Sequence, residues 1–218
     1  MAEPLVLDLW ADVACPWCWI GTRRLATALE AEPPGSVVVR HRAFELQPDL
    51  PPEGLPRDEH YARRFGSPEA MRTAFERVAG MGAADGLEFD FERQRRAPNT
   101  RLAHRLVKLA ESQGRGDEAM EALFRGHFAG GADLSDPEQA VALLATPEVG
   151  LNAEALHAAL ELGAGEPEVI ADEETAQRLD ITGVPFFLAG GTVALSGAHE
   201  ADLLRKLVAA ARERAASG

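Results

Sequence analysis

A chain of 218 residues that is 46% hydrophobic and 26% charged can bury a sizeable core, as one domain with an elaboration or as two coupled units. Its formal net charge of −13 argues against binding to nucleic acid and to an anionic membrane surface. No segment resembles a membrane span, and the N-terminal residues lack the features of a secretory signal peptide, so we expect a cytoplasmic protein.

The first predicted strand, which starts at Leu5, leads into a Cys-x-x-Cys motif, and a helix continues from the motif to about Glu32. Backbone N–H groups at a helix start have no intrahelical acceptor and carry the positive end of the helix dipole, so they stabilise a thiolate on Cys15. Pro16 suits the first helical turn. Cys18 lies about one turn further, where it can attack a mixed disulfide. We therefore predict Cys15 as the nucleophile and Cys18 as the resolving thiol.

The two cysteines are the only ones in the chain. A disulfide between them would close a very short loop and constrain the unfolded chain little, so a structural crosslink is a poor explanation. A zinc site uses the same spacing but needs two further ligands. The histidines are scattered without ligand spacing, at His41, His60, His104, His127, His157 and His199. The pattern thus favours a redox pair, and we predict no metal.

After a break at residues 33–35, residues 37–44 are a second predicted strand. A strand, a helix and a second strand form a right-handed parallel βαβ unit, which places Cys15 at the carboxyl end of the first strand. Open α/β sheets keep their functional sites there.

Residues 47–179 carry helix signals and no strand-like run of any length. Prolines at positions 48, 51, 52 and 56 mark a loop at the beginning of this segment. N-cap residues or prolines begin the predicted helices, and some of them stop at glycines. The predicted helices span residues 67–82, 99–114, 117–129, 137–145, 152–162 and 167–179.

Strand signals return at residues 185–188 and 192–195, which flank a Gly-Gly turn typical of a tight hairpin, and a final amphipathic helix follows. The element order is β-α-β, then helices, then β-β-α. We predict an α/β fold in which residues 1–46 and 180–218 form one discontinuous domain and residues 47–179 form an all-helical insertion.

This arrangement resembles the thioredoxin fold, in particular the DsbA-like thiol oxidoreductases, whose helical domain is inserted at this place. The segments that carry the resemblance are 12–18 (Asp-Val-Ala-Cys-Pro-Trp-Cys), 99–106 (Asn-Thr-Arg-Leu-Ala-His-Arg-Leu), 181–187 (Ile-Thr-Gly-Val-Pro-Phe-Phe) and 195–198 (Leu-Ser-Gly-Ala). Together they are similar to the FrnE-type branch of the family, and the resemblance spans nearly the whole chain. The first and third segments are specific as a pair.

In that family the proline of Gly-Val-Pro is cis and lies opposite the Cys-x-x-Cys motif, and the residue before it offers backbone groups to an extended substrate. The resemblance therefore implies that Pro185 is cis and that Val184 pairs with the substrate by short β-augmentation. The alternative interpretation is a turn proline at the beginning of an edge strand.

The positions of four further residues in the sequence suggest their roles. Trp17 lies between the thiols, where side chains usually sit at the mouth of the site, so we predict that it contacts substrate, whereas Trp19 packs in the core. Asp12 and Glu45 each follow a predicted strand and are candidate proton acceptors for Cys18, although solvated loop carboxylates are commoner.

Asn99 is interpreted first as the N-cap of the predicted helix at residues 99–114. His104 lies on the polar edge of its predicted helix and is interpreted as an exposed histidine, but its place in the second matching segment implies a position near the cleft. The acid-rich run at residues 172–174 is interpreted as a solvated helix face.

The sequence therefore predicts a cytoplasmic thiol:disulfide oxidoreductase of the oxidase or isomerase type. A redox-active disulfide serves in place of a cofactor, with glutathione as an optional co-substrate. The partners are protein or small-molecule thiols and disulfides. The oligomeric state, the physiological substrate and the direction of the reaction stay open.

Two alternatives remain. One is a glutathione-dependent isomerase or transferase resembling the kappa-class glutathione transferases, in which one residue at the position of Cys15 serves glutathione and no second thiol is required. The other is a polypeptide-binding chaperone in which both thiols are incidental. The presence of Cys18 argues against the first.

Overall fold

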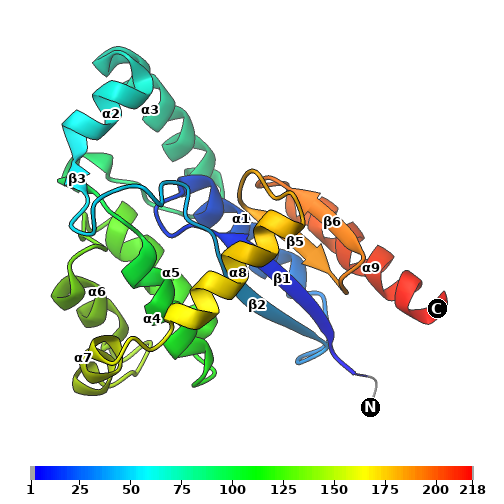
Figure 1. The fold of residues 1–218 in the computed structure, drawn as a ribbon. Coiled ribbons are helices and arrows are strands. Elements are labelled where there is room, and N and C mark those ends of the chain that lie inside the picture. The colour runs from blue at the N-terminus through cyan, green and yellow to red at the C-terminus, as the bar shows by residue number, and fades with distance from the viewer. Residues whose placement is uncertain (1–2, 218) are drawn as a thin grey trace.

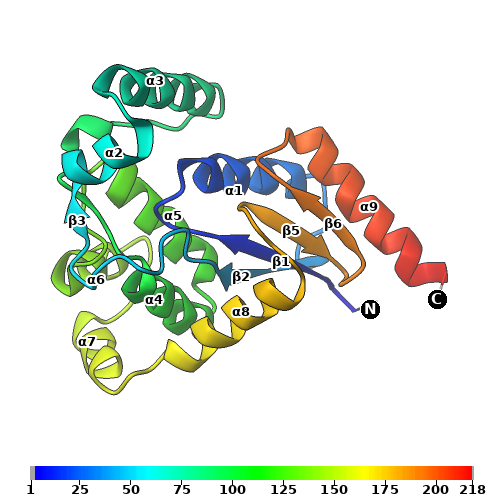
Figure 2. The same cartoon turned by 45° about the horizontal axis from the view of Figure 1, so that its top comes forward.

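The computed structural model describes residues 3–217, in which a mixed sheet carries helices on both faces (Figures 1 and 2). Its strands are β1 (Leu5–Ala11), β2 (Val37–Ala43), β5 (Phe186–Ala189) and β6 (Val193–Ser196), in the spatial order β2-β1-β5-β6. Strand β1 runs parallel to β2 and antiparallel to β5, and β5 runs antiparallel to β6. This confirms the thioredoxin-like β-α-β and β-β-α halves.

Strand β1 is central, and both of its faces are covered. Alternate residues of a strand point to opposite faces. Leu7 and Leu9 therefore join the main core, whereas Trp10 packs on the other side with Ala176. Figure 2 shows α1 and α9 together on one face of the sheet and α8 on the opposite face. These helices are α1 (Pro16–Leu29), α8 (Glu166–Arg178) and α9 (Ala201–Ser217).

The chain between β2 and β5 is mainly helical, as predicted. Before α8 it forms α2 (Arg57–Phe65), α3 (Pro68–Ala84), α4 (Arg101–Glu111), α5 (Gly116–Phe128), α6 (Pro137–Leu144) and α7 (Ala153–Glu161). Helices α4, α5 and α8 contact β2, and hydrophobic side chains of the insertion share one core cluster with those of the sheet. The division of the chain at residues 47 and 179 into two units stays a prediction.

Local capping explains why several of these helices begin where the sequence predicts. The side chains of Ser67, Asp136 and Asn152 each accept a hydrogen bond from a first-turn backbone N–H, at 3.1, 2.9 and 2.8 Å. Each bond satisfies a donor that has no partner within the helix.

The insertion also contains elements that the sequence did not predict. Helix α2 lies between the loop marked by four prolines and the first predicted helix, in a stretch for which no element was predicted. Strands β3 (Leu55–Pro56) and β4 (Arg96–Ala97) form an antiparallel pair, and η1 (Phe91–Arg93) is a short 3₁₀ helix. Elements of two or three residues are too short to show a hydrophobic period.

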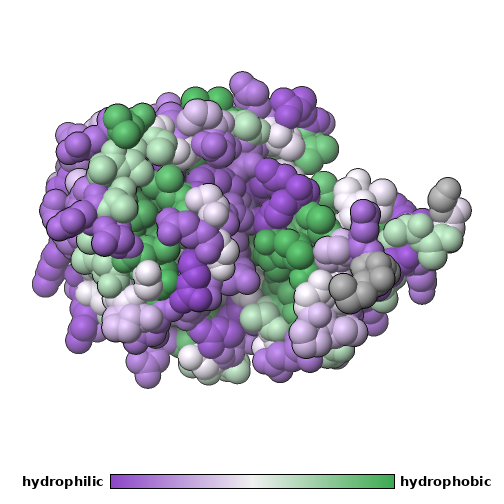
Figure 3. Space-filling model, turned by 90° about the horizontal axis from the view of Figure 1, so that it is seen from below, coloured by the Kyte–Doolittle hydropathy of each residue, from purple (hydrophilic) through white to green (hydrophobic). Residues whose placement is uncertain are grey.

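Seen from below, hydrophilic residues cover most of the surface, and hydrophobic residues gather in separate patches (Figure 3). Scattered exposed hydrophobic residues are normal for globular proteins. No helix within residues 3–217 combines the length and the hydrophobicity needed to cross a membrane.

Candidate active site

Cys15 lies at the junction between the loop that follows β1 and helix α1. Its backbone is extended, with φ −97° and ψ 112°, and Pro16 is the first residue of the helix. Cys15 is 5% exposed, and Cys18, about one turn further, is fully buried. Both are free thiols. The strand, loop and helix therefore place the two sulfur-bearing residues together as the sequence predicted.

The chain before β5 lies against Cys15. The Val184–Pro185 peptide bond is cis, as the resemblance implied, and Cys15 Sγ lies 3.9 Å from the carbonyl oxygen of Val184. Gly21 on α1 permits this close approach, because a Cβ atom at that position would lie 2.8 Å from Pro185 Cγ. Tertiary folding thus brings the Gly-Val-Pro segment to the thiols.

A buried polar pair lies close to the thiols. The carboxylate of Asp12 accepts hydrogen bonds from the backbone N–H groups of Ala14 at 3.0 Å and Leu46 at 2.7 Å. Nε2 of His104 lies 3.7 Å from Asp12 Oδ1 and has no hydrogen-bond partner among the described residues. Asp12 is therefore a buried carboxylate, so the commoner alternative of a solvated loop carboxylate is wrong for this residue.

The interpretation of His104 as an exposed histidine is wrong, because its side chain is 3% exposed. Helix α4 buries Ala103, Leu106, Val107 and Ala110, and His104 lies at the margin of this face. The sheet and the Asp12 loop cover that margin, so the buried face is wider than the apolar pattern of the helix.

Burial and charge set the protonation of this group of residues. Burial acts to raise the pKa of Asp12, but attraction to His104 and the two backbone N–H groups outweigh it, so the pKa of Asp12 is lowered. Burial raises the pKa of Cys18 well above its ordinary value, and the Cys15 side chain and the Asp12 charge contribute to the rise. Cys18 is therefore held as a neutral thiol beside an ionised carboxylate.

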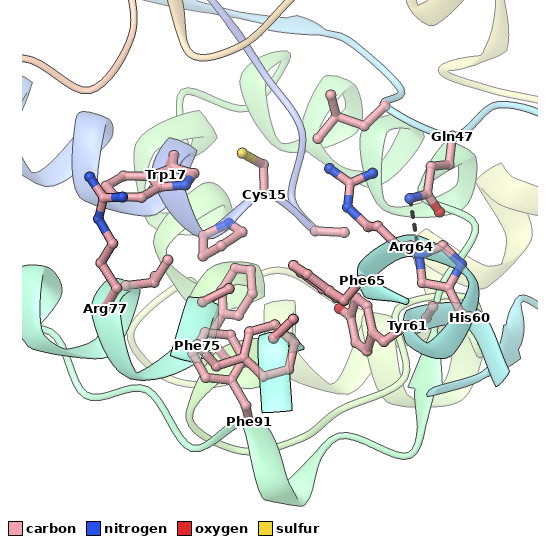
Figure 4. A pocket seen from close by; sticks show the side chains of 18 of the residues that line it. Cys15, Trp17, Gln47, His60, Tyr61, Arg64, Phe65, Phe75, Arg77 and Phe91 are labelled. Carbon is pink, nitrogen blue, oxygen red and sulfur yellow. Dashed lines mark hydrogen bonds between the residues drawn. The ribbon is translucent and has the colours of Figure 1, made fainter. Parts of the chain in front are cut away.

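A cavity of about 890 Å³ opens over Cys15 (Figure 4). Its lining comes from the start of α1, the segment after β2, and helices α2 and α3. Trp17 lines the cavity next to Cys15. Trp19 instead packs in the core as predicted, with its ring centroid 4.9 Å from that of Phe89. The candidate nucleophile therefore lies at the wall of this cavity.

The family model of the DSBA-like thioredoxin domain matches residues 6–209. The chain belongs to the DsbA-like family of thiol oxidoreductases. A probable DsbA oxidoreductase from Streptomyces coelicolor is 34% identical to it, over 96% of this chain and 90% of that chain, with a TM-score of 0.85. No curated protein sequence matches the chain.

Two more distant structures share the DsbA-like fold of the chain. The cytosolic disulfide reductase DsbM from Pseudomonas aeruginosa is 19% identical, over 98% of this chain and 100% of that chain, with a TM-score of 0.66. A 2-hydroxychromene-2-carboxylate isomerase is 15% identical, over 98% of this chain and 99% of that chain, with a TM-score of 0.68.

Glu45 of this DsbA-like chain lies in an ion-pair cluster, and no hydrogen bond joins it to Cys18 within residues 3–217. Its Oε2 lies 3.1 Å from Nη1 of Arg101, and the same guanidinium donates to Glu173 at 2.6 Å. Burial and the neighbouring Glu173 raise the pKa of Glu45 to about 8, although Arg101 opposes the rise. Glu45 therefore favours its protonated form more than an exposed glutamate does.

Asn99 joins the beginning of α4 to the loop after β2. Its Oδ1 accepts the backbone N–H of Arg101 at 3.0 Å, and its Nδ2 donates to the carbonyl of Leu50 at 2.8 Å. The side chain therefore satisfies a first-turn donor, as predicted, although Thr100 is the residue that directly precedes the helix.

The acid-rich run on α8 is not uniformly solvated, so the interpretation of Asp172 is wrong. Asp172 is 2% exposed, and its carboxylate contacts Lys108 at 2.6 Å and Arg42 at 2.8 Å and accepts the Ala43 N–H at 3.0 Å. Glu174, two residues further, is 62% exposed at its side chain. The face of α8 that carries Asp172 packs on β2 and α4. The local sequence of α8 does not specify these packing partners.

Sequence reasoning missed the side chains from α2 and α3 that line the cavity. Tyr61 and Phe65 are four residues apart, which is the spacing of one helix face. That spacing favours a helix, but no element was predicted between the proline-marked loop and the helix that begins at Ser67. Within residues 3–217, no group of three or more histidine, cysteine, aspartate or glutamate side chains is placed to hold a metal ion.

Proposed function

We propose that this chain is a thiol:disulfide oxidoreductase of the oxidase or isomerase type, with Cys15 as the nucleophile and Cys18 as the resolving thiol. The observation that carries the proposal is the position of Cys15 at the N-terminus of α1, with Sγ 3.9 Å from the Val184 carbonyl oxygen. A helix N-terminus favours negative charge and so favours a thiolate there.

The proposed reaction needs only the two thiols and a substrate disulfide. The Cys15 thiolate attacks one substrate sulfur, forms a mixed disulfide and releases the other substrate sulfur as a thiolate. Cys18 loses its proton and attacks Cys15 Sγ, which releases the second substrate thiolate and closes the Cys15–Cys18 disulfide. Two electrons pass from the dithiol to the substrate, and the reverse sequence oxidises a substrate dithiol.

The neighbouring residues have supporting roles in this proposal. Val184 and Pro185 hold an extended substrate segment beside the sulfur, and Trp17 contacts the substrate at the cavity wall. Asp12, backed by His104, receives the proton that Cys18 releases. The Asp12 carboxylate is buried and lies close enough to Cys18 for its charge to influence that thiol, and this proximity supports the role.

In this proposal Glu45 and Asn99 hold neighbouring segments of the chain in place and do not take part in the chemistry. Glu45 ties the segment after β2 to Arg101 at the beginning of α4, and Asn99 ties Leu50 to the same turn. Both therefore position the cavity wall without contacting the sulfurs.

We further propose the FrnE-type branch of the family, a cytoplasmic location and no cofactor beyond the redox-active dithiol. Glutathione is the co-substrate that we favour, since DsbM, a cytosolic disulfide reductase of the same fold, has been solved with GSH. The four matching sequence segments support the branch assignment.

The decisive experiment compares reduction of insulin and refolding of scrambled ribonuclease by the wild type, Cys15→Ser and Cys18→Ser. We expect Cys15→Ser to lose at least about 100-fold in both rates, because the attacking sulfur is absent. Cys18→Ser is expected to accumulate a mixed disulfide at Cys15, seen by mass spectrometry. Equal rates for the wild type and Cys15→Ser would remove the proposal.

A glutathione-dependent isomerase or transferase is the second candidate, favoured by the cavity over Cys15. A 2-hydroxychromene-2-carboxylate isomerase with the same fold supports it. The Cys18→Ser variant separates the two functions. Full activity of that variant on a small glutathione-linked substrate would select the second candidate.

A further inference from the structure

Four aromatic side chains form a connected surface in the cavity over Cys15. They are Tyr61 and Phe65 from α2, Phe75 from α3 and Phe91 from η1. The ring centroid of Phe75 lies 5.1 Å from that of Tyr61, 5.7 Å from that of Phe65 and 4.2 Å from that of Phe91. Such rings favour stacked or edge-on contact with a further aromatic ring.

The side chain of Arg57 packs against two rings of this aromatic surface. The guanidinium of Arg57 lies 5.5 Å from the Phe75 ring centroid and 5.8 Å from that of Tyr61. Its charge is balanced by Asp58 at 3.0 Å and Glu92 at 3.5 Å. Arg57 therefore supports the rings and is not free to bind an anionic ligand.

Two other arginines, Arg64 on α2 and Arg77 on α3, line the cavity with their charges unmatched. Figure 4 shows them on opposite flanks of Cys15. Neither forms a salt bridge with any residue that the structure describes, whereas Arg63, next to Arg64, pairs with Glu59 at 2.7 Å. Unpaired guanidinium groups beside an apolar surface are suited to bind a carboxylate.

The lining also contains two carboxylates. Asp12 is buried and already accepts two backbone hydrogen bonds, so it is not available to a ligand. Glu69 is exposed at the first turn of α3. Arg64 and Arg77 thus balance the two carboxylates of the lining in formal charge, and they are its only arginines.

The size of the cavity and the burial of Cys15 limit which disulfides can reach the sulfur. A volume of about 890 Å³ lies within the range of small-molecule pockets, roughly 300–1,000 Å³. Cys15 itself is only 5% exposed. A small disulfide enters such a space intact, whereas a folded protein must first present a protruding loop.

We propose that the preferred substrate of the Cys15–Cys18 pair is a small disulfide that combines an aromatic ring with a carboxylate. The ring lies against the surface around Phe75, and the carboxylate binds Arg64 or Arg77. This inference rests on the proposed function and specifies its substrate class. Cys15 breaks the substrate S–S bond, Cys18 closes the protein disulfide, and two aromatic thiolates leave with the two electrons.

The test uses the reduced full chain and three probes. They are 5,5′-dithiobis(2-nitrobenzoate), which is aromatic and anionic, 4,4′-dithiodipyridine, which is aromatic and neutral, and 2-hydroxyethyl disulfide, which is aliphatic and neutral. Loss of free thiols is followed by quenching with an alkylating reagent and mass spectrometry. Each variant is compared with the wild type for the same probe, which cancels the intrinsic reactivity of the probes.

For the charge, the test variant is Arg64→Gln with Arg77→Gln, and the control is Arg63→Gln with Arg72→Gln. Both doubles lie on the same two helices and change the net charge equally. We expect the test double to react about tenfold more slowly with the anionic probe and to stay within about twofold for the neutral probes. Equal slowing by both doubles would overturn the proposed carboxylate site.

For the ring, Phe75→Leu is expected to slow both aromatic probes about fivefold and to leave the aliphatic probe unchanged. Equal effects on all three probes would overturn the aromatic preference. A wild-type protein that oxidises with none of the probes would instead contradict the proposed function itself. Thermal unfolding of each variant verifies that it is folded.

Discussion

At the scale of single residues, the chemistry depends on the charges around Cys18. The thiol is fully buried and lies near Cys15 and the ionised Asp12 carboxylate, and all three factors raise its pKa. Asp12 keeps its charge despite burial because His104 and two backbone N–H groups stabilise the carboxylate. Cys18 therefore stays protonated in the reduced protein. We expect it to lose its proton when it attacks a mixed disulfide at Cys15.

Replacement of Asp12 by asparagine should lower the pKa of Cys18, because a neutral amide no longer opposes the thiolate. In a Cys15→Ser background, where Cys18 is the only thiol, we expect the titration midpoint to fall. Ultraviolet absorbance of the thiolate as a function of pH measures the midpoint. Asp49→Asn, in the loop after β2, is the matched control, and an unchanged midpoint in Asp12→Asn would contradict this account.

At the scale of elements, Asp172 connects helix α8 to its neighbours through ion pairs and hydrogen bonds. Its carboxylate contacts Arg42 on β2 and Lys108 on α4 and accepts the backbone N–H of Ala43. The carbonyl of the same residue accepts the Trp10 indole N–H at 3.2 Å. Asp172 thus connects α8 to the edge strand β2, to Trp10 of the central strand β1 and to helix α4.

Asp172→Asn should destabilise the fold, because it removes the negative charge that two cations share in a buried position. We expect a loss of about 2 kcal/mol in the free energy of unfolding, since Asp8 and Glu111 still face those cations. Glu174→Gln on the exposed face should change it by less than about 0.5 kcal/mol. Urea unfolding measures both, and equal effects would count against the proposed role.

At the scale of the whole molecule, a charge cluster joins the sheet to the insertion. Arg101 on α4 lies 3.1 Å from Glu45 after β2, 2.6 Å from Glu173 and 3.1 Å from Glu166 on α8. Burial and the neighbouring carboxylates raise the pKa of Glu45 to about 8 from its ordinary value of 4.5. The folded chain therefore keeps a proton that the unfolded chain releases.

This difference predicts that stability falls as the pH rises from about 4.5 to 8, because the unfolded state binds fewer protons in that window. The contribution of Glu45 is fully present below its unfolded pKa and is lost as the pH passes its folded pKa. Glu45→Gln should flatten the dependence. Urea unfolding at several pH values tests it, with the exposed Glu76→Gln as control, and parallel pH profiles for Glu45→Gln and the wild type would refute the prediction.

The amino-acid sequence by itself determined most of the longer helices and the strands of the main sheet, and the identity of the reactive groups. The Cys-Pro-Trp-Cys motif, the capping side chains of Ser67, Asp136 and Asn152, and the Gly-Gly turn between β5 and β6 all act over a few residues. Short-range hydrogen bonds and backbone preferences are encoded locally, so they can be recognised in the linear chain.

Only the tertiary structure decided which polar groups are buried and what surrounds the sulfurs. Asp172 and Arg42 are 130 residues apart, and Cys15 and Val184 are 169 apart. His104 and the cavity rings of α2 and α3 likewise depend on which faces meet. Burial and charge pairing are properties of two packed surfaces, and no local pattern within one element specifies its partner.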